Sequence, residues 1–238
     1  MKNTTILVVE DDLQILELIS LYLLNSGFSV VKAVDGVTAL QVFEREAPQL
    51  VLLDINLPEM NGFDLCNEIR SVSNTPIIII SCNSETEDIM RGLEIGADDY
   101  VTKPFDPNVL VARVKANLRR APLFRRQAAA ESAVVETKPM LRFDGLEIDL
   151  SSFDVYVNGR QVSLSAKETQ LLTLLASNPN RIFTAEDLYS RVWGVDSNSD
   201  TRTVIVHISS LRKKIEPDPA SPKYIQNLRG IGYKFQAR

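Results

Sequence analysis

The sequence has few cysteines and no long apolar run, and both absences limit what the protein can be. Among 238 residues only Cys66 and Cys82 are cysteines, without a C-x-x-C pair or a nearby histidine, so neither a disulfide framework nor a zinc site is indicated. No stretch of about 18 uncharged apolar residues occurs, and the first residues, MKNTTILVVEDD, lack the apolar-then-small pattern of a signal peptide. We therefore expect a cytoplasmic protein that has no membrane partner.

The composition is that of an ordinary globular protein, with 45% apolar and 24% charged residues, but the charge is divided unevenly. Residues 1–139 contain 13 Lys and Arg against 20 Asp and Glu, a net charge of −7. Residues 140–238 contain 13 against 11, a net charge of +2. An acidic first half and a mildly basic second half suggest a charge-sensitive module joined to a part that binds a polyanion.

In the first half, short β-branched runs alternate with segments of helical length. This alternation predicts a (βα)5 doubly wound parallel sheet with helices on both faces and right-handed crossovers. In such a sheet the functional site lies outside the carboxyl ends of the strands. The runs are TILVV before Glu10, FSVVKAV around Val31, LVLLD ending at Asp54, PIIIIS ending at Ser81 and DYVTK ending at Lys103; helical patterns such as LQILELISLYLLNSG and GVTALQVFEREAP lie between them.

The pattern changes after Arg120, and residues 121–137 are expected to form a linker because they are Ala-rich, mostly polar and without a period. The segments LRFDGLEIDL and DVYVNGRQVSL follow as alternating strands, with Asn158-Gly159 as a hairpin turn. Three helical segments come next, two of them opening with the capping-box spacings SAKE and TAED. With the closing strands of YIQNLRGIGYKF, residues 138–238 are predicted to form an α+β winged helix.

Polar side chains at the predicted strand ends should meet at one edge of the sheet. Several carboxylates at one point raise each other's pKa unless a cation lies among them, and oxygen ligands suit Mg²⁺ or Mn²⁺. Asp54, at the end of a buried run, could be a turn or helix-capping residue. With a cation beside it, it could instead be a nucleophile towards phosphorus, with Lys103 and Ser81 stabilising the phosphoryl oxygens. The side chains concerned are Glu10, Asp11, Asp54, Ser81 and Lys103.

The segments ILVVEDD, LVLLDINLPEMNG, PIIIIS and GADDYVTKPF resemble the receiver domain of two-component response regulators, here residues 1–120. RTVIVHISSLRKKI and YIQNLRGIGYKF resemble the winged-helix DNA-binding domain of the OmpR/PhoB subfamily, here residues 138–238. The resemblance implies a transcription factor that is no enzyme beyond promoting its own phosphotransfer and dephosphorylation with Mg²⁺. It also implies four kinds of partner: a sensor histidine kinase, double-stranded DNA with direct-repeat promoter sites, RNA polymerase, and a second copy of the chain after phosphorylation.

The same resemblance assigns roles to residues of the first half. Asp54 matches the phosphoacceptor, and Lys103 matches the phosphate-binding lysine, followed by a cis peptide bond to Pro104. Tyr100 matches the aromatic partner of a switch with Ser81, although it could be an ordinary strand aromatic. The metal contacts are matched by Glu10, Asp11, Asp54 and the backbone carbonyl of Asn56, and Asn56 and Asn83 occupy positions that tune phosphate lifetime.

In the second half, the resemblance and the helical period together indicate a DNA-binding face. Val204, Ile208, Leu211 and Ile215 form one apolar stripe, which predicts the core side of a recognition helix. His207 is the only histidine and could also be a surface or core residue. Ile205 stands where the family usually has an acid, so base specificity does not carry over. The residues expected to face DNA, mostly its phosphates, are Arg202, Thr203, His207, Ser210, Arg212 and Lys213, with Arg229 entering the minor groove.

The resemblance further implies a receiver dimer through the fourth helix, fifth strand and fifth helix. The ion pairs Asp99–Arg113 and Asp98–Arg120 have counterparts here. A third family ion pair is replaced at both ends, by Ile89 and Val109. Replacing both partners by apolar groups can be neutral or stabilising, so we expect these two residues to pack across the dimer. The alternative is that both are isolated surface apolar residues.

Two other functions fit parts of the sequence. A phosphatase of the haloacid dehalogenase type also uses an aspartate at a strand end, but it needs a second acid two positions later, where this chain has Asn56. A regulator that binds DNA without phosphorylation would not require the full set of acids together with Ser81 and Lys103. The sequence therefore favours the phosphorylation-controlled regulator.

Overall fold

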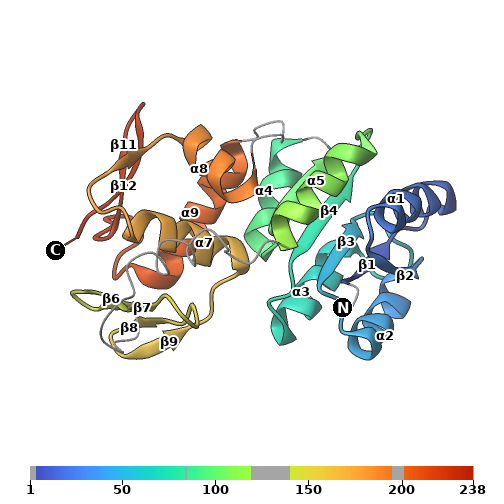
Figure 1. The fold of residues 1–238 in the computed structure, drawn as a ribbon, viewed down its shortest axis with the longest axis horizontal. Helices are drawn as coiled ribbons and strands as arrows, with labels where there is room; N and C mark the ends of the chain where they lie inside the picture. The colour runs from blue at the N-terminus through green and yellow to red at the C-terminus, as the bar shows by residue number, and fades with distance from the viewer. Residues whose placement is uncertain (1–3, 84, 119–139, 195–200, 238) are drawn as a thin grey trace. The chain divides into compact units, whose positions relative to one another are not determined.

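The computed structural model describes residues 4–83, 85–118, 140–194 and 201–237. Within them the chain forms two compact units, one built on residues 4–118 and the other on residues 140–192 and 201–237 (Figure 1). The boundaries predicted at residues 120 and 138, and the linker between them, lie outside the described residues. None of the described helices has both the length and the apolar character needed to cross a membrane.

The N-terminal unit is built on a five-stranded parallel sheet in the order β2-β1-β3-β4-β5, which confirms the expected (βα)5 fold. The strand order reverses between β1 and β3, so the carboxyl ends of these two strands flank the switch point where such sheets place their sites. The elements are β1 (Thr5–Val9), α1 (Leu13–Asn25), β2 (Ser29–Ala33), α2 (Gly36–Glu46), β3 (Leu50–Asp54), α3 (Gly62–Val72), β4 (Ile77–Ser81), α4 (Thr86–Ile95), β5 (Asp99–Thr102) and α5 (Pro107–Leu118).

Two apolar layers, one on each face, enclose this sheet. Ile6 and Val8 of β1 pack with α1 and α5, whereas Leu7 and Val9 pack with α2 and α3 (Figure 1). All residues of β3 and β4 are buried, which explains their nearly continuous apolar sequences. The acid Asp54 and the hydroxyl of Ser81 are the last residues of these two strands, so they lie where the apolar layers end.

The C-terminal unit has a four-stranded antiparallel sheet, β6-β7-β8-β9, then three helices and a three-stranded sheet, β10-β12-β11. The hairpin turn predicted at Asn158-Gly159 is confirmed, since both residues have positive φ (50° and 77°), as a two-residue type I′ turn requires. The pairing of β10 with β12 was not predicted. The elements are β6 (Met140–Phe143), β7 (Leu146–Asp149), β8 (Val155–Val157), β9 (Arg160–Val162), α7 (Ala166–Ala176), β10 (Ile182–Phe183), α8 (Ala185–Trp193), α9 (Thr201–Ile215), β11 (Ile225–Leu228) and β12 (Gly232–Phe235).

Both predicted capping boxes are present at helix starts. The Ser165 hydroxyl accepts from the Glu168 N–H (3.4 Å), and the Glu168 carboxylate accepts from the Ser165 N–H (2.7 Å). Thr184 and Asp187 exchange the same two bonds at the start of α8, at 3.1 and 3.4 Å. Each box satisfies two N–H groups that a helix start otherwise leaves without partners, so the sequence fixes where α7 and α8 begin.

Candidate functional site

Asp54 is the last residue of β3 and is only 3% exposed. After it the chain turns back at once, because the Gly62 N–H donates to the Ile55 carbonyl at 2.9 Å. A Cβ at Gly62 would lie 2.7 Å from the Ile55 Cα, so only glycine allows this close approach. Asn61 then begins α3 by accepting the Phe63 N–H (2.8 Å). The tight loop leaves the carboxylate at the open end of the sheet.

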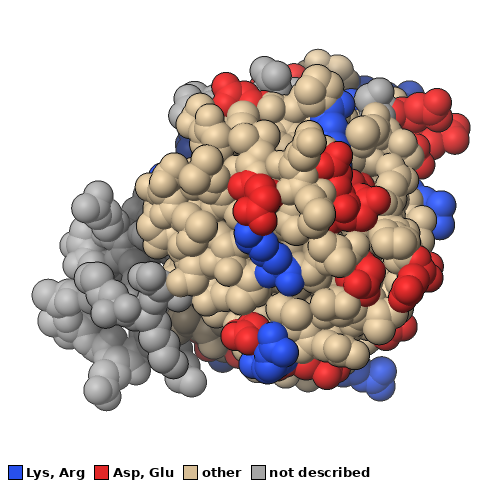
Figure 2. Space-filling view, turned by 90° about the vertical axis from the view of Figure 1, so that its right-hand side faces the viewer, with Lys and Arg blue, Asp and Glu red and all other residues tan. Residues whose placement is uncertain are grey.

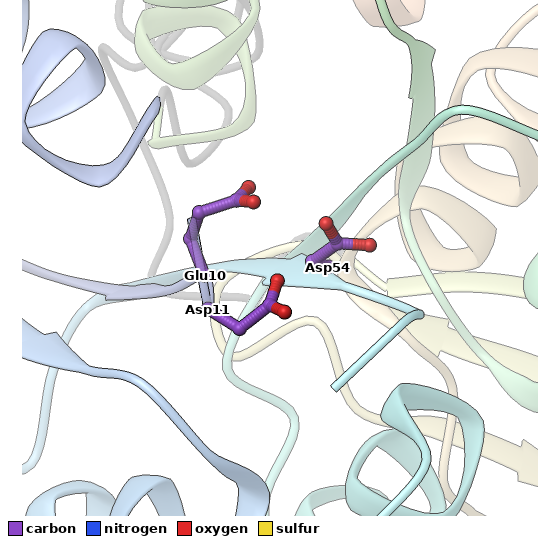
Figure 3. A group of neighbouring side chains, drawn as sticks. All are labelled: Glu10, Asp11 and Asp54. Carbon is purple, nitrogen blue, oxygen red and sulfur yellow. The ribbon is translucent and has the colours of Figure 1, made fainter. Parts of the chain in front are cut away.

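Three carboxylates meet at this point, as Figure 3 shows. Glu10 and Asp11 follow β1 and Asp54 ends β3, and each offers an oxygen within 4.8 Å of the others. Glu10 is buried, whereas Asp11 is exposed. The next acid, Asp12, serves another purpose, since its carboxylate caps α1 by accepting the N–H groups of Gln14 and Ile15.

Lys103, which follows β5, connects two of these acids. Its Nζ donates to Asp54 Oδ2 at 2.5 Å and to Glu10 Oε1 at 2.8 Å, and its side chain is 9% exposed. Burial raises the pKa of Glu10 to about 7. The hydrogen bond from Lys103 acts to lower this pKa, and the nearby Asp54 adds to the increase. Burial acts to lower the pKa of Lys103, but its bonds to Asp54 and Glu10 outweigh this and raise it. The expected cis peptide bond joins Lys103 to Pro104.

The donor set fits a hard divalent cation. Its members are all carboxylate oxygens, and Glu10 Oε2 is buried with no hydrogen-bond partner among the described residues. Such an oxygen is costly to bury without a donor or a cation. Asp11 lies on the exposed side, which leaves room for the water ligands that Mg²⁺ retains. Glu10, Asp11 and Asp54 are therefore the residues that would hold Mg²⁺ or Mn²⁺.

Ser81 and Tyr100 are linked through the loop after β4. The buried Ser81 Oγ accepts the Asn83 N–H (3.1 Å), and the Tyr100 hydroxyl donates to the Asn83 carbonyl (2.9 Å). Tyr100 is 7% exposed; burial raises the pKa of its hydroxyl, and a hydrogen bond with Ser81 partly offsets this. Asn56 is exposed, and its N–H donates to Asp54 Oδ1 (2.9 Å). The contribution of its carbonyl to a metal site stays a prediction.

The residues assigned to the dimer make contacts within one chain. Arg113 Nη1 donates to both carboxylate oxygens of Asp99, at 2.8 and 3.0 Å. Asp98 Oδ2 accepts from Arg70 Nη2 (2.6 Å), a partner that the sequence did not indicate. Arg120 lies outside the described residues. Ile89 is 2% exposed and Val109 is half-buried, so their packing across a dimer stays a prediction.

The recognition helix predicted by the sequence is α9, but its buried surface is broader than the predicted stripe. Thr203 and His207 were expected on the face towards DNA, yet they are only 1% and 2% exposed. Val206 is buried as well, so burial extends around the helix beyond one row of positions. Ile205 is 49% exposed and Lys213 is exposed. Arg202 and Ser210 are half-buried.

Arg212 and Arg229, both assigned to DNA binding, differ in whether their guanidinium groups are already bound within the protein. Arg212 donates Nε and Nη2 to the Ile225 carbonyl, at 3.0 and 2.7 Å, so its guanidinium is bound to β11. Arg229 is exposed in the turn between β11 and β12. The sequence did not indicate a role for Glu216, whose carboxylate accepts three backbone N–H groups of residues 223–225. No local pattern could reveal it, because its partners are brought to it by the fold.

Comparison with known proteins adds to this geometry. Residues 6–115 match the family described as "Response regulator receiver domain", and residues 159–235 match "Transcriptional regulatory protein, C terminal". The chain is 43% identical over 229 residues to the uncharacterized transcriptional regulatory protein YcbL of Bacillus subtilis, covering 96% of this chain and 99% of that one. It is 42% identical over 229 residues to the DNA-binding response regulator MtrA of Mycobacterium tuberculosis, covering 96% and 95%.

Solved structures give the same result. A RitR mutant has a TM-score of 0.73 at 28% identity, and the response regulator DrrB, an OmpR/PhoB homologue of Thermotoga maritima, has 0.50 at 34% identity. Both comparisons cover 99% of this chain and all of the other. Since both family matches and the full-length relatives agree, the chain belongs to the OmpR/PhoB family of two-component response regulators.

Proposed function

We propose that this response regulator is a transcription factor whose DNA binding is switched on when a sensor histidine kinase phosphorylates Asp54. The observation that supports this most is the bond of Lys103 to Asp54 Oδ2, within a cluster of acids at the switch point of the sheet. A buried carboxylate that accepts a hydrogen bond from a lysine and lies beside the exposed acid Asp11 is suited to attack phosphorus. The haloacid dehalogenase chemistry lacks its second acid, because Asn56 is an amide.

The transfer forms a bond between an Asp54 oxygen and phosphorus and breaks the bond from phosphorus to the histidine nitrogen, whose electron pair returns to the imidazole. Mg²⁺ or Mn²⁺, when bound, neutralises phosphoryl oxygens. Lys103 already lies 2.5 Å from Asp54 Oδ2, so it can follow the negative charge onto the phosphoryl group without leaving the site. The same residues would promote hydrolysis of the aspartyl phosphate, in which water takes the phosphoryl group. We assign no other reaction to the protein.

Ser81 would respond to phosphorylation by contacting the new phosphoryl group. Its hydroxyl, which accepts the Asn83 N–H in the structure, would turn to donate to a phosphoryl oxygen. Because the Tyr100 hydroxyl is bound to the carbonyl of the same Asn83, this loop and the Tyr100 ring would move together. We assign the switch to Ser81, Asn83 and Tyr100, and the resulting dimer to the α4, β5 and α5 face that carries Asp98, Asp99 and Arg113.

DNA binding belongs to the C-terminal unit. Figure 2 shows the face on the right-hand side of Figure 1, which carries α1 and α2; acidic side chains are spread widely over it, and the fewer basic ones mostly lie beside acidic ones. Such a face repels DNA phosphates. In contrast, α9 exposes Lys213, and the turn of the β11–β12 hairpin, which we call the wing, exposes Arg229; the two side chains suit phosphate and minor-groove contacts. The phosphorylated dimer would bind direct-repeat promoter sites and would act there on RNA polymerase. Its location would be the cytoplasm.

The test uses the full-length protein, acetyl phosphate and Mg²⁺, with the mass of the intact protein as the measurement. Wild type should gain one phosphoryl group, and the gain should vanish with EDTA or in Asp54→Asn. Asp64→Asn, which changes an exposed acid of α3 outside the carboxylate cluster, is the matched control and should be labelled like wild type. Equal labelling of Asp54→Asn and wild type would reject the assignment of the phosphoacceptor.

A further inference from the structure

Two side chains in and just after the last turn of α9 hold the beginning of strand β11. Glu216 is 8% exposed, and its carboxylate accepts the N–H groups of Lys223 (2.6 Å), Tyr224 (3.0 Å) and Ile225 (2.8 Å). Arg212 donates two bonds to the Ile225 carbonyl, at 3.0 and 2.7 Å. The helix end therefore binds both polar backbone groups of Ile225. We call these five residues the wing clamp.

The clamp satisfies groups that the sheet leaves open. In the order β10-β12-β11 the strand β11 is at an edge, so among the described strands none lies beside its outer N–H and C=O groups. A carboxylate that accepts three N–H groups forms charge-assisted bonds, which are stronger than neutral ones. The contact between α9 and β11 is thus a specific set of hydrogen bonds and not only apolar packing.

The other side of the clamp is also fixed. The Tyr224 hydroxyl donates to the Asp144 carbonyl (2.6 Å), and Lys223 Nζ donates to the Asp144 carboxylate (2.7 Å), in the turn between β6 and β7. Tyr224 also stacks on Phe235 of β12, with ring centroids 6.2 Å apart. Residues 223 and 224 are held from two directions, so Glu216 acts on a rigid part of the chain.

The position of the clamp decides its effect on the wing. Arg229 comes four residues after Ile225, and at about 3.3 Å per strand residue the turn lies roughly 13 Å from the clamp. A small rotation at the base of the hairpin therefore displaces Arg229 by several times more than it moves Ile225. We propose that Glu216 and Arg212 are positioning residues for DNA binding, which set the angle between the recognition helix and the wing so that both engage DNA at once. This inference rests on the proposed DNA-binding function.

The experiment is a double-mutant cycle on the phosphorylated full-length protein. Glu216→Gln keeps the shape of the side chain but replaces an acceptor by a donor, so at least one of the three N–H groups loses its partner. Affinity is measured by fluorescence anisotropy on a duplex selected from random DNA by the wild type. We expect Glu216→Gln to weaken DNA binding about tenfold in the wild-type background. In the Arg229→Ala background the loss should be less than about twofold, because the arginine that Glu216→Gln would displace is already absent. In Lys213→Ala the full tenfold loss should remain.

Hydrogen exchange supplies a second readout, since the amides of residues 223–225 should exchange faster in Glu216→Gln. Equal weakening in the wild-type and Arg229→Ala backgrounds would overturn the positioning role, as would unchanged affinity despite faster exchange. If Glu216→Gln unfolds below the assay temperature, the same cycle is run with Arg212→Lys, which keeps one donor to the Ile225 carbonyl. Failure of the proposed function looks different: Lys213→Ala and Arg229→Ala would each leave affinity unchanged, whatever the amides do.

Discussion

Lys103 Nζ and Asp54 Oδ2 lie 2.5 Å apart although 49 positions separate the two residues in the chain. The strand order places β3 and β5 on either side of β4, so the two residues reach each other past the end of β4. The same lysine bonds Glu10 at 2.8 Å. The ammonium group of Lys103 is therefore the counter-charge for two buried acids, so removing Lys103 affects both of them.

Replacing Lys103 by Met should destabilise the metal-free protein and increase the stabilisation that Mg²⁺ provides. Without Lys103, the buried carboxylate of Asp54 loses its counter-charge and the side chain of Glu10 loses its hydrogen-bond donor, at a cost of about 3 kcal/mol. Mg²⁺ can supply that charge, so its addition should raise the unfolding midpoint of Lys103→Met more than that of wild type. Thermal unfolding with EDTA or Mg²⁺ measures both. Lys115→Met, at an exposed position of α5, is the control; an equal Mg²⁺ shift in all three proteins would contradict the prediction.

The raised pKa of Glu10 predicts how the stability of the metal-free protein depends on pH. The pKa is about 7 in the folded chain against an ordinary value of 4.5, so between these values the unfolded state has already lost the proton that the folded state keeps. The free energy of unfolding therefore falls as the pH rises from about 4.5 to about 7, and this contribution then levels off.

Glu10→Gln carries no proton to lose, so its stability relative to wild type should increase over the same window. The increase should be on the order of 2 kcal/mol, because each unit of pKa difference between the folded and unfolded chain is worth about 1.4 kcal/mol and solvent screening reduces the full effect. Urea unfolding in EDTA at several pH values is the measurement. Glu17→Gln, at an exposed carboxylate of α1, should run parallel to wild type. Parallel curves for Glu10→Gln and wild type would show that Glu10 has an ordinary pKa.

Much of the N-terminal unit could be predicted from the sequence, because its strands are short apolar runs between clear helical patterns. LVLLD coincides with β3, and the rule that parallel strands bring their carboxyl ends together was enough to gather Asp11, Asp54 and Lys103. The hairpin turn at Asn158-Gly159 and the capping boxes of the C-terminal unit were predictable for the same reason, since local residues determine them.

What the sequence did not show depends on contacts between distant segments. Arg70 donates to Asp98, which is 28 positions away, and Glu216 accepts the N–H groups of residues 223–225, at and just before the start of β11. The two-residue strand β10 exists only because β12 lies beside it. The burial of Thr203 and His207 likewise depends on what packs around α9, whereas a helical period indicates only the most apolar side.

The two cysteines should react very differently in the native protein. Cys66 is buried, and burial raises the pKa of its thiol to about 11, so the reactive thiolate is rare at neutral pH. Cys82 is exposed in the loop after Ser81. Iodoacetamide at about pH 8 should therefore label Cys82 alone, and both thiols after unfolding in guanidinium. Native Cys82→Ser should take up no label, and labelling of that variant would show that Cys66 is accessible.

The neighbouring cations Arg212 and Lys213 should affect the salt dependence of DNA binding differently. Each phosphate contact contributes about one unit to the slope of log affinity against log salt concentration. Lys213 is exposed and should make such a contact, so Lys213→Ala should flatten the slope by about one unit, as should Arg229→Ala.

Arg212 was assigned to a phosphate as well, but its guanidinium is bound to the Ile225 carbonyl. Arg212→Ala should therefore weaken binding at every salt concentration and change the slope much less. Anisotropy titrations over a range of KCl concentrations separate the two effects, and equal flattening by Arg212→Ala and Lys213→Ala would mean that Arg212 leaves β11 to bind a phosphate.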